Sequence, residues 1–137
     1  MDYYSAEEVD AYLDSISTLE QEFPDVIFIY MTGNAQGIGA DGYNRYLRNQ
    51  QIRQFCSDND KILFDFADLD AWYYDANAQE WDQETYDYNG TTVPAEHPHF
   101  HGDEAGHTIY ESCEQKGNAV WWLMAVLAGW DNLLDDL

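Results

Sequence analysis

The feature that most constrains the fold is a pair of apolar runs, the first of them unbroken, with a helical segment between them. Residues 26–31 read VIFIYM and residues 62–66 read ILFDF, and each run has the length of a strand. A run without polar alternation is typical of a strand buried on both faces, as in a parallel sheet covered by helices. Residues 43–59 between them have an imperfect apolar helical face. Strand, helix and strand in this order predict a right-handed βαβ unit and the α/β fold class.

Two further helices are expected near the ends of the chain. Ser5 and Glu8 have the spacing of a capping box in front of a helical apolar face, which predicts a helix over residues 5–22. The strongest helical pattern begins at about Ser112 and is closed by Gly129. Three tryptophans of this segment are expected in the core: Trp121, Trp122 and Trp130. A two-stranded sheet is marginal alone, so the fold needs more strands than these patterns supply.

Length and charge set the class of protein and of partner. A chain of 137 residues predicts one domain. Its 27 acidic and 5 basic side chains give a net charge of −22, which repels phosphate backbones and anionic lipid headgroups. We therefore expect neither nucleic acid nor a membrane surface as a partner, and cations or neutral, carbohydrate-like ligands fit better. The sequence also has no 18-residue apolar run and no signal-peptide pattern after Met1.

Two segments are expected as loops. Residues 32–42 hold four of the nine glycines and follow the first strand, where α/β sheets bind ligands, but they contain no phosphate-binding motif. Residues 67–106 read as a long acidic, aromatic loop. Its aromatic side chains resemble stacking surfaces for sugars, although packing over the sheet edge is the simpler interpretation: Trp72, Tyr73, Tyr74, Trp81, Tyr86 and Tyr88.

Few side chains offer metal, redox or anion chemistry. His97, His99 and His101 alternate along the chain and could begin a metal site, but the irregular segment favours a solvated histidine loop, so we expect no metal and no cofactor. The basic side chains Arg45, Arg48 and Arg53 are expected to pair with acidic groups more readily than to clamp a substrate carboxylate. Cys56 and Cys113 lie at a predicted helix end and a helix start, which motivates the hypothesis of a disulfide.

His107 is the candidate general base. It stands just before the last helix, with Glu104 three positions earlier and Asp103 four, so that a carboxylate could orient the imidazole ring. The alternative is a histidine hydrogen-bonded to backbone in front of the helix, with no part in catalysis.

Three blocks of the chain carry a resemblance. DVIFIYMTGN (25–34), NQQIRQFCSDNDKILFDFADLDAW (49–72) and GHTIYESCEQKGNAVWWLMAVLAGW (106–130) resemble, in order, the C-terminal half of a secreted bacterial branch of the SGNH (GDSL-like) hydrolases. The resemblance implies a flavodoxin-like three-layer α/β/α fold, here partial because its N-terminal strands are lacking. It also implies an ester hydrolase of acyl or acetyl groups, including carbohydrate esters, in an extracellular or periplasmic location.

The resemblance also assigns roles to residues. His107 takes the place of the family histidine, and Glu104 stands where an aspartate is usual, with Asp103 as the alternative. His97, followed by a proline, is a rival, but Pro94 occupies the position three residues before it.

A serine nucleophile is what the pattern lacks. None of the five serines lies on a strand-to-helix elbow: Ser5, Ser15, Ser17, Ser57 and Ser112. The sequence therefore predicts the histidine half of an ester hydrolase, inactive alone, whose small-molecule or carbohydrate ester substrate would bind once an N-terminal segment completes the site. The alternative is a non-catalytic acidic module that binds a cation or a glycan.

Overall fold

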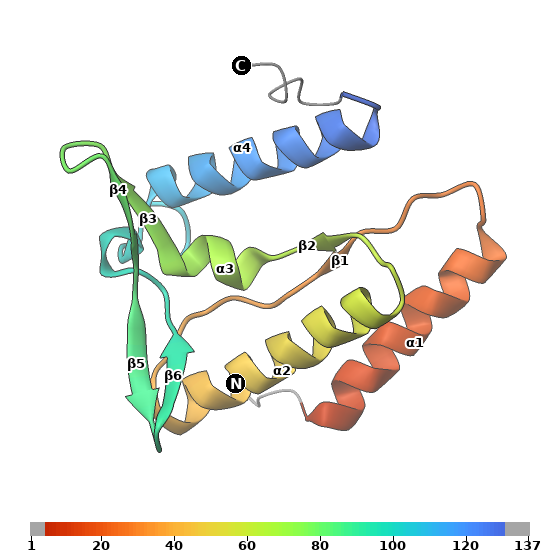
Figure 1. The fold of residues 1–137 in the computed structure, drawn as a ribbon, viewed down its shortest axis with the longest axis horizontal. Coiled ribbons are helices and arrows are strands. Elements are labelled where there is room, and N and C mark those ends of the chain that lie inside the picture. Colours follow the sequence, from red (N-terminus) through yellow and green to blue (C-terminus); the bar gives the residue numbers. More distant parts are fainter. Residues whose placement is uncertain (1–4, 131–137) are drawn as a thin grey trace. The chain divides into compact units, whose positions relative to one another are not determined.

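The computed structural model describes residues 5–130, and the chain divides between His99 and Phe100 into two compact units. The first unit contains three helices, α1 (Ala6–Glu22), α2 (Gly39–Asp58) and α3 (Phe66–Ala71), and two short strands, β1 (Tyr30–Met31) and β2 (Leu63–Phe64) (Figure 1). It also contains four further strands: β3 (Trp72–Asp75), β4 (Glu80–Gln83), β5 (Thr85–Tyr88) and β6 (Thr91–Pro94). The 3-10 helix η1 (Pro98–Phe100) crosses the division, and the second unit contains α4 (Tyr110–Leu127). The single domain expected from the chain length stays a prediction.

Helix α1 begins as its sequence predicts. The Ser5 hydroxyl accepts a hydrogen bond from the Glu8 backbone N–H at 3.2 Å, and the Glu8 carboxylate accepts one from the Ser5 N–H at 2.7 Å. This capping box satisfies two of the backbone donors that a helix start leaves without partners. The helix ends at Glu22, two residues before Pro24, as expected.

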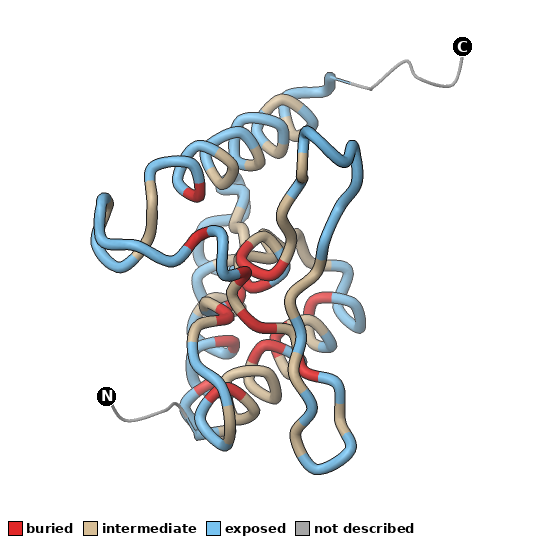
Figure 2. Tube along the Cα trace, turned by 90° about the vertical axis from the view of Figure 1, so that its left-hand side faces the viewer, coloured by how far each residue is buried: buried red, intermediate tan, exposed pale blue. Residues whose placement is uncertain are grey.

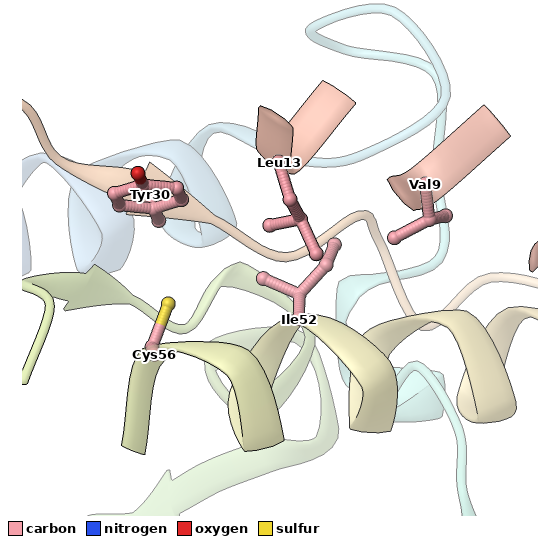
Figure 3. Close-up of a cluster of buried hydrophobic side chains, with 5 residues drawn as sticks. All are labelled: Val9, Leu13, Tyr30, Ile52 and Cys56. Carbon is pink, nitrogen blue, oxygen red and sulfur yellow. The ribbon is translucent and has the colours of Figure 1, made fainter. Parts of the chain in front are cut away.

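The hydrophobic core of the first unit lies among α1, α2 and β1. Val9 and Leu13 of α1 face Ile52 and Cys56 of α2, and Tyr30 of β1 lies at the end of the cluster (Figure 3). All five side chains are buried. This burial raises the pKa of the Cys56 thiol and of the Tyr30 phenol. The buried residues drawn in red in Figure 2 belong mostly to this unit.

Strands β1 and β2 pair in parallel, with Tyr30 opposite Leu63 and Met31 opposite Phe64. Helix α2 connects them, so the α/β class, the parallel pairing and the βαβ order are confirmed. The expected burial on both faces is wrong, because Tyr30 is buried and Met31, on the other face of β1, is 49% exposed. The physical reason is that Tyr30 packs on α1 and α2. Val26 and Ile27, which belong to the expected strand but lie before β1, are 53% and 61% exposed.

The expected loop at residues 67–106 is wrong over most of its length. It contains most of α3 and two antiparallel hairpins, β3–β4 and β5–β6. At the β5–β6 turn, Asn89 and Gly90 have φ values of 53° and 82°, the left-handed pair that a tight type I′ hairpin needs. In β3, the consecutive aromatic residues Trp72, Tyr73 and Tyr74 hide the alternation of a strand. In β5, Tyr86 and Tyr88 do alternate with Thr85 and Asp87, but the strand is only four residues long. A search for longer apolar and polar alternation therefore fails to find these strands.

Helix α4 is confirmed, and it begins at Tyr110, two residues before Ser112. Gly129, with φ 89°, follows its end as the predicted C-terminal cap. The expected burial of Trp121, Trp122 and Trp130 is wrong, since they are 78%, 53% and 51% exposed. An apolar pattern specifies the helix, but burial also needs a surface to pack against. Among the described residues, no helix is long and apolar enough to cross a membrane.

Candidate functional site

His107 lies in the segment that leads into α4. Its backbone has φ 69°, a left-handed conformation that is uncommon outside glycine, and its N–H donates to the Asp103 carboxylate at 3.2 Å. The Nδ1 atom of the ring is 4.0 Å from the same carboxylate oxygen. Both side chains are exposed, at 90% and 86%. The segment therefore holds the backbone of His107, while the ring lies in solvent within reach of one carboxylate.

Glu104 contacts the start of α4 and not His107. Its carboxylate accepts a hydrogen bond from the Tyr110 N–H at 3.1 Å, at the first residue of α4. The N-cap residue of this helix, Ile109, has no side chain that can accept such a bond. A carboxylate at a helix N-terminus is favourable both as an acceptor and through the helix dipole. Of the two candidate orienting groups, Asp103 is thus the one in contact with His107.

A second histidine, His97, is in hydrogen-bond contact with a carboxylate. The Nε2 atom of His97 is 3.2 Å from Asp82 Oδ2, and the His97 side chain is 11% exposed. Its Nδ1 accepts a hydrogen bond from the His99 N–H at 3.2 Å. Since Nδ1 is an acceptor, a neutral ring carries its proton on Nε2 and donates it to Asp82. The sequence signal for this pair is weak, because Asp82 lies fifteen residues before His97.

Tyr73 joins the two neighbouring histidines into one cluster. Its ring stacks on His99 with centroids 3.8 Å apart, and it lies 5.1 Å from His97. In the part of the chain that the structure describes, no three His, Cys, Asp or Glu side chains are grouped to hold a metal ion. Two of the three alternating histidines that suggested a metal site, His97 and His99, pack on an aromatic ring, and His101 is exposed.

The loop after β1 is held by side chains from two elements, α2 and α3. The Asn49 amide oxygen of α2 accepts from the Gly33 N–H at 2.9 Å, and the buried Asp70 carboxylate of α3 accepts from the Ala35 N–H at 2.9 Å. Asn34 Oδ1 accepts from Arg45 Nη1 at 2.9 Å. A shallow recess beside this loop is lined partly by Arg45 and Asn49. As expected from the sequence, this loop follows a strand at its carboxyl end.

Arg53 confirms the prediction of an arginine paired with an acid. Its guanidinium donates twice to Asp65, with Nε to Oδ2 at 2.6 Å and Nη2 to Oδ1 at 2.8 Å. Asp65 also accepts from the Thr32 hydroxyl at 2.9 Å. The bidentate geometry connects the end of α2 to the residue after β2. Arg48, by contrast, donates to the amide of Gln51 at 2.9 Å.

Within residues 5–130, Ser112 contacts a basic side chain but is not accessible. Ser112 accepts a hydrogen bond from the Lys116 ammonium one turn later, yet it is completely buried. A serine without solvent contact cannot reach a substrate. Cys56 and Cys113 are both free thiols, the first buried and the second exposed, and the disulfide hypothesis gains no support from either.

Comparison with known proteins adds no relative to these observations. The chain is a mixed α/β protein with a short parallel sheet and two antiparallel hairpins. No protein-family model, no curated protein and no solved structure matches it.

Proposed function

We propose that the chain is the C-terminal portion of an SGNH-like ester hydrolase, with His107 as its general base. The observation that carries the proposal is the position of His107: it precedes α4, its backbone is held by Asp103, and its ring is exposed to a reactant. In the completed site, the imidazole takes the proton of a serine hydroxyl supplied by an upstream segment. It then returns the proton to the leaving alcohol.

The placement of the resembling blocks supports this proposal. The first block includes β1 and the start of its loop, the second includes β2 and α3, and the third includes α4. Parallel pairing of β1 with β2 agrees with an α/β sheet. The partial three-layer arrangement, the acyl or acetyl ester substrate and the location outside the cytoplasm belong to the same proposal.

Asp103 is the proposed orienting group. It touches both the N–H and, at 4.0 Å, the ring of His107, whereas Glu104 is engaged by the first turn of α4. A carboxylate that contacts Nδ1 stabilises the imidazolium formed when the histidine takes a proton. Glu104 then serves as a helix cap.

Turnover of p-nitrophenyl acetate tests the assignment. The 137-residue chain should give none, and a longer product of the same locus should be active. In that product, His107→Ala should lower kcat/KM by about 10²- to 10⁴-fold, the usual contribution of a general base. The control is His101→Ala, which removes another exposed histidine. The assignment is overturned if His107→Ala keeps the activity of the parent protein. It is also overturned if the loss expected of His107→Ala is found only in His97→Ala.

The two carboxylates can be separated in the same product. Asp103→Asn should lower kcat with little change in thermal stability, because the residue is exposed. Glu104→Gln should instead leave kcat near the parent value and lower the stability of α4 by about 0.5 kcal/mol, since a neutral amide interacts less with the helix dipole. The reverse pattern would make Glu104 the orienting group.

A further inference from the structure

We infer that one face of the β3–β4 hairpin is a binding surface for a neutral glycan, with Trp81 and Tyr74 as its stacking platform. The surface lies entirely within the first unit. It contains neither His107 nor its carboxylates, so the inference is independent of the proposed hydrolase. We call it the hairpin face and define it by four residues: Trp72, Tyr74, Trp81 and Gln83.

The strand register brings these four side chains together. Tyr74 is opposite Trp81, and Trp72 is opposite Gln83. Side chains two residues apart lie on the same side of a strand, so both pairs share one face. The Tyr74 and Trp81 rings have centroids 5.3 Å apart and planes inclined by 54°, which makes them one continuous aromatic surface. They are 42% and 60% exposed.

The opposite face of the same hairpin carries the charges. The alternate register pairs are Asp75 with Glu80 and Tyr73 with Asp82. The Asp82 carboxylate contacts the His97 ring. The Asp75 carboxylate accepts hydrogen bonds from the backbone N–H groups of Asn77 and Ala78 in the turn, and these bonds lower the pKa of Asp75. The hairpin therefore separates an ionic face from an aromatic face that ends in a neutral amide.

The separation of charged and aromatic faces favours one class of ligand. An anion is repelled by the net charge of −22, and residues 68–88 contain no lysine or arginine to receive it. A cation is drawn to carboxylates, and those of β3 and β4 lie on the other face. The neighbouring Asp68 carboxylate of α3 is hydrogen-bonded to the Trp72 side chain. A neutral sugar matches the hairpin face, because its weakly positive C–H groups fit the negative face of an aromatic ring and its hydroxyls fit the Gln83 amide.

Polysaccharide binding by the 137-residue chain tests the inference. Native gels cast with neutral β-glucan, glucomannan or arabinoxylan should retard the chain, and gels with anionic polygalacturonate should not. Trp81→Ala should weaken the affinity measured by retardation about fivefold, since one aromatic stacking contact contributes on the order of 1 kcal/mol. Trp81→Phe, which keeps a ring, should retain most of it.

The matched control is Trp122→Ala, which removes a tryptophan of similar exposure, 53%, from α4. It should bind as the parent chain does, and so should His107→Ala. The inference is overturned if no neutral polysaccharide retards the parent chain or if Trp81→Ala binds as well as Trp122→Ala. A circular dichroism spectrum establishes that each variant is folded.

Discussion

The two hairpins have similar compositions and opposite surroundings. Both have four-residue strands that combine aromatic and acidic side chains. In β5–β6, Tyr86 donates its hydroxyl hydrogen to the Gly39 carbonyl at 3.1 Å, and Tyr88 stacks on Tyr43 of α2 with centroids 4.8 Å apart. In β3–β4, Tyr74 and Trp81 remain exposed. Aromatic content alone therefore does not distinguish a packing residue from a surface platform.

The two hairpins are also attached by different forces. The β5–β6 hairpin lies against α2, where a Cβ at Gly42 would collide with the Tyr86 hydroxyl and the Gly37 carbonyl oxygen. Only glycine permits that approach. The β3–β4 hairpin is fixed by polar and ring contacts of Asp82 and Tyr73 with the histidines that follow β6. The β5–β6 hairpin thus depends mainly on close packing against α2, and the β3–β4 hairpin on the His97–Asp82 contact and on ring stacking of Tyr73.

The largest expected effect comes from the buried side of β5–β6. Val93 is fully buried, and Val93→Ala should lower the free energy of unfolding by about 2 kcal/mol because its apolar surface is lost from the interior. Thr92→Ala, at the exposed neighbouring position, should change it by less than about 0.5 kcal/mol. Urea denaturation measures both. Equal values would contradict the packing of the Val93 side of the β5–β6 hairpin.

A somewhat smaller effect is expected where β3–β4 is anchored. His97→Ala removes the partner of Asp82 and leaves the His99 N–H without its acceptor, which should cost about 1 to 2 kcal/mol. Hydrogen exchange should become faster at the β3 and β4 amides and remain unchanged in α1. His101→Ala is the control for loss of a histidine. If exchange rises equally in both variants, His97 does not anchor this hairpin.

The smallest expected effect is that of one hydroxyl. Tyr86→Phe removes the hydrogen bond to Gly39 and should cost about 1 kcal/mol at pH 7, whereas Tyr74→Phe on the exposed face should cost almost nothing. Burial raises the pKa of Tyr86. The neutral phenol is therefore favoured in the folded state. The stability that this adds to the folded protein is lost as the pH rises from the pKa of an unfolded tyrosine, near 10, through the higher pKa of folded Tyr86.

Stability measured at pH 7 and at alkaline pH checks that sign. The difference between the parent chain and Tyr86→Phe should narrow as the pH rises, because only the parent loses the stabilisation of a neutral phenol. A difference that stays constant or widens would contradict burial of the Tyr86 hydroxyl. Burial also raises the pKa of Tyr30, so the parent chain and Tyr86→Phe should both lose some stability at alkaline pH.

Features that depend on neighbouring residues were predictable. The capping box at Ser5, the helical spacing of α1 and the glycine after α4 each involve residues within a few positions of one another. The βαβ order follows from the apolar runs, although each strand is shorter than its run. The site was only partly predictable. His107 and Asp103 are four residues apart and do contact each other, but their spacing could not distinguish Asp103 from Glu104 as the partner.

By itself, the sequence determined α1, α2 and α4, the parallel pair of strands and the net charge of −22. The tertiary structure decided which side chains are buried and which distant groups meet. Trp121 belongs to an apolar helix and is exposed, while Tyr86 belongs to an acidic strand and packs on α2. His97 reaches Asp82 because β4 and the segment after β6 are neighbours in space. Local hydrogen bonding specifies an element, but burial depends on the surface that another element brings to it.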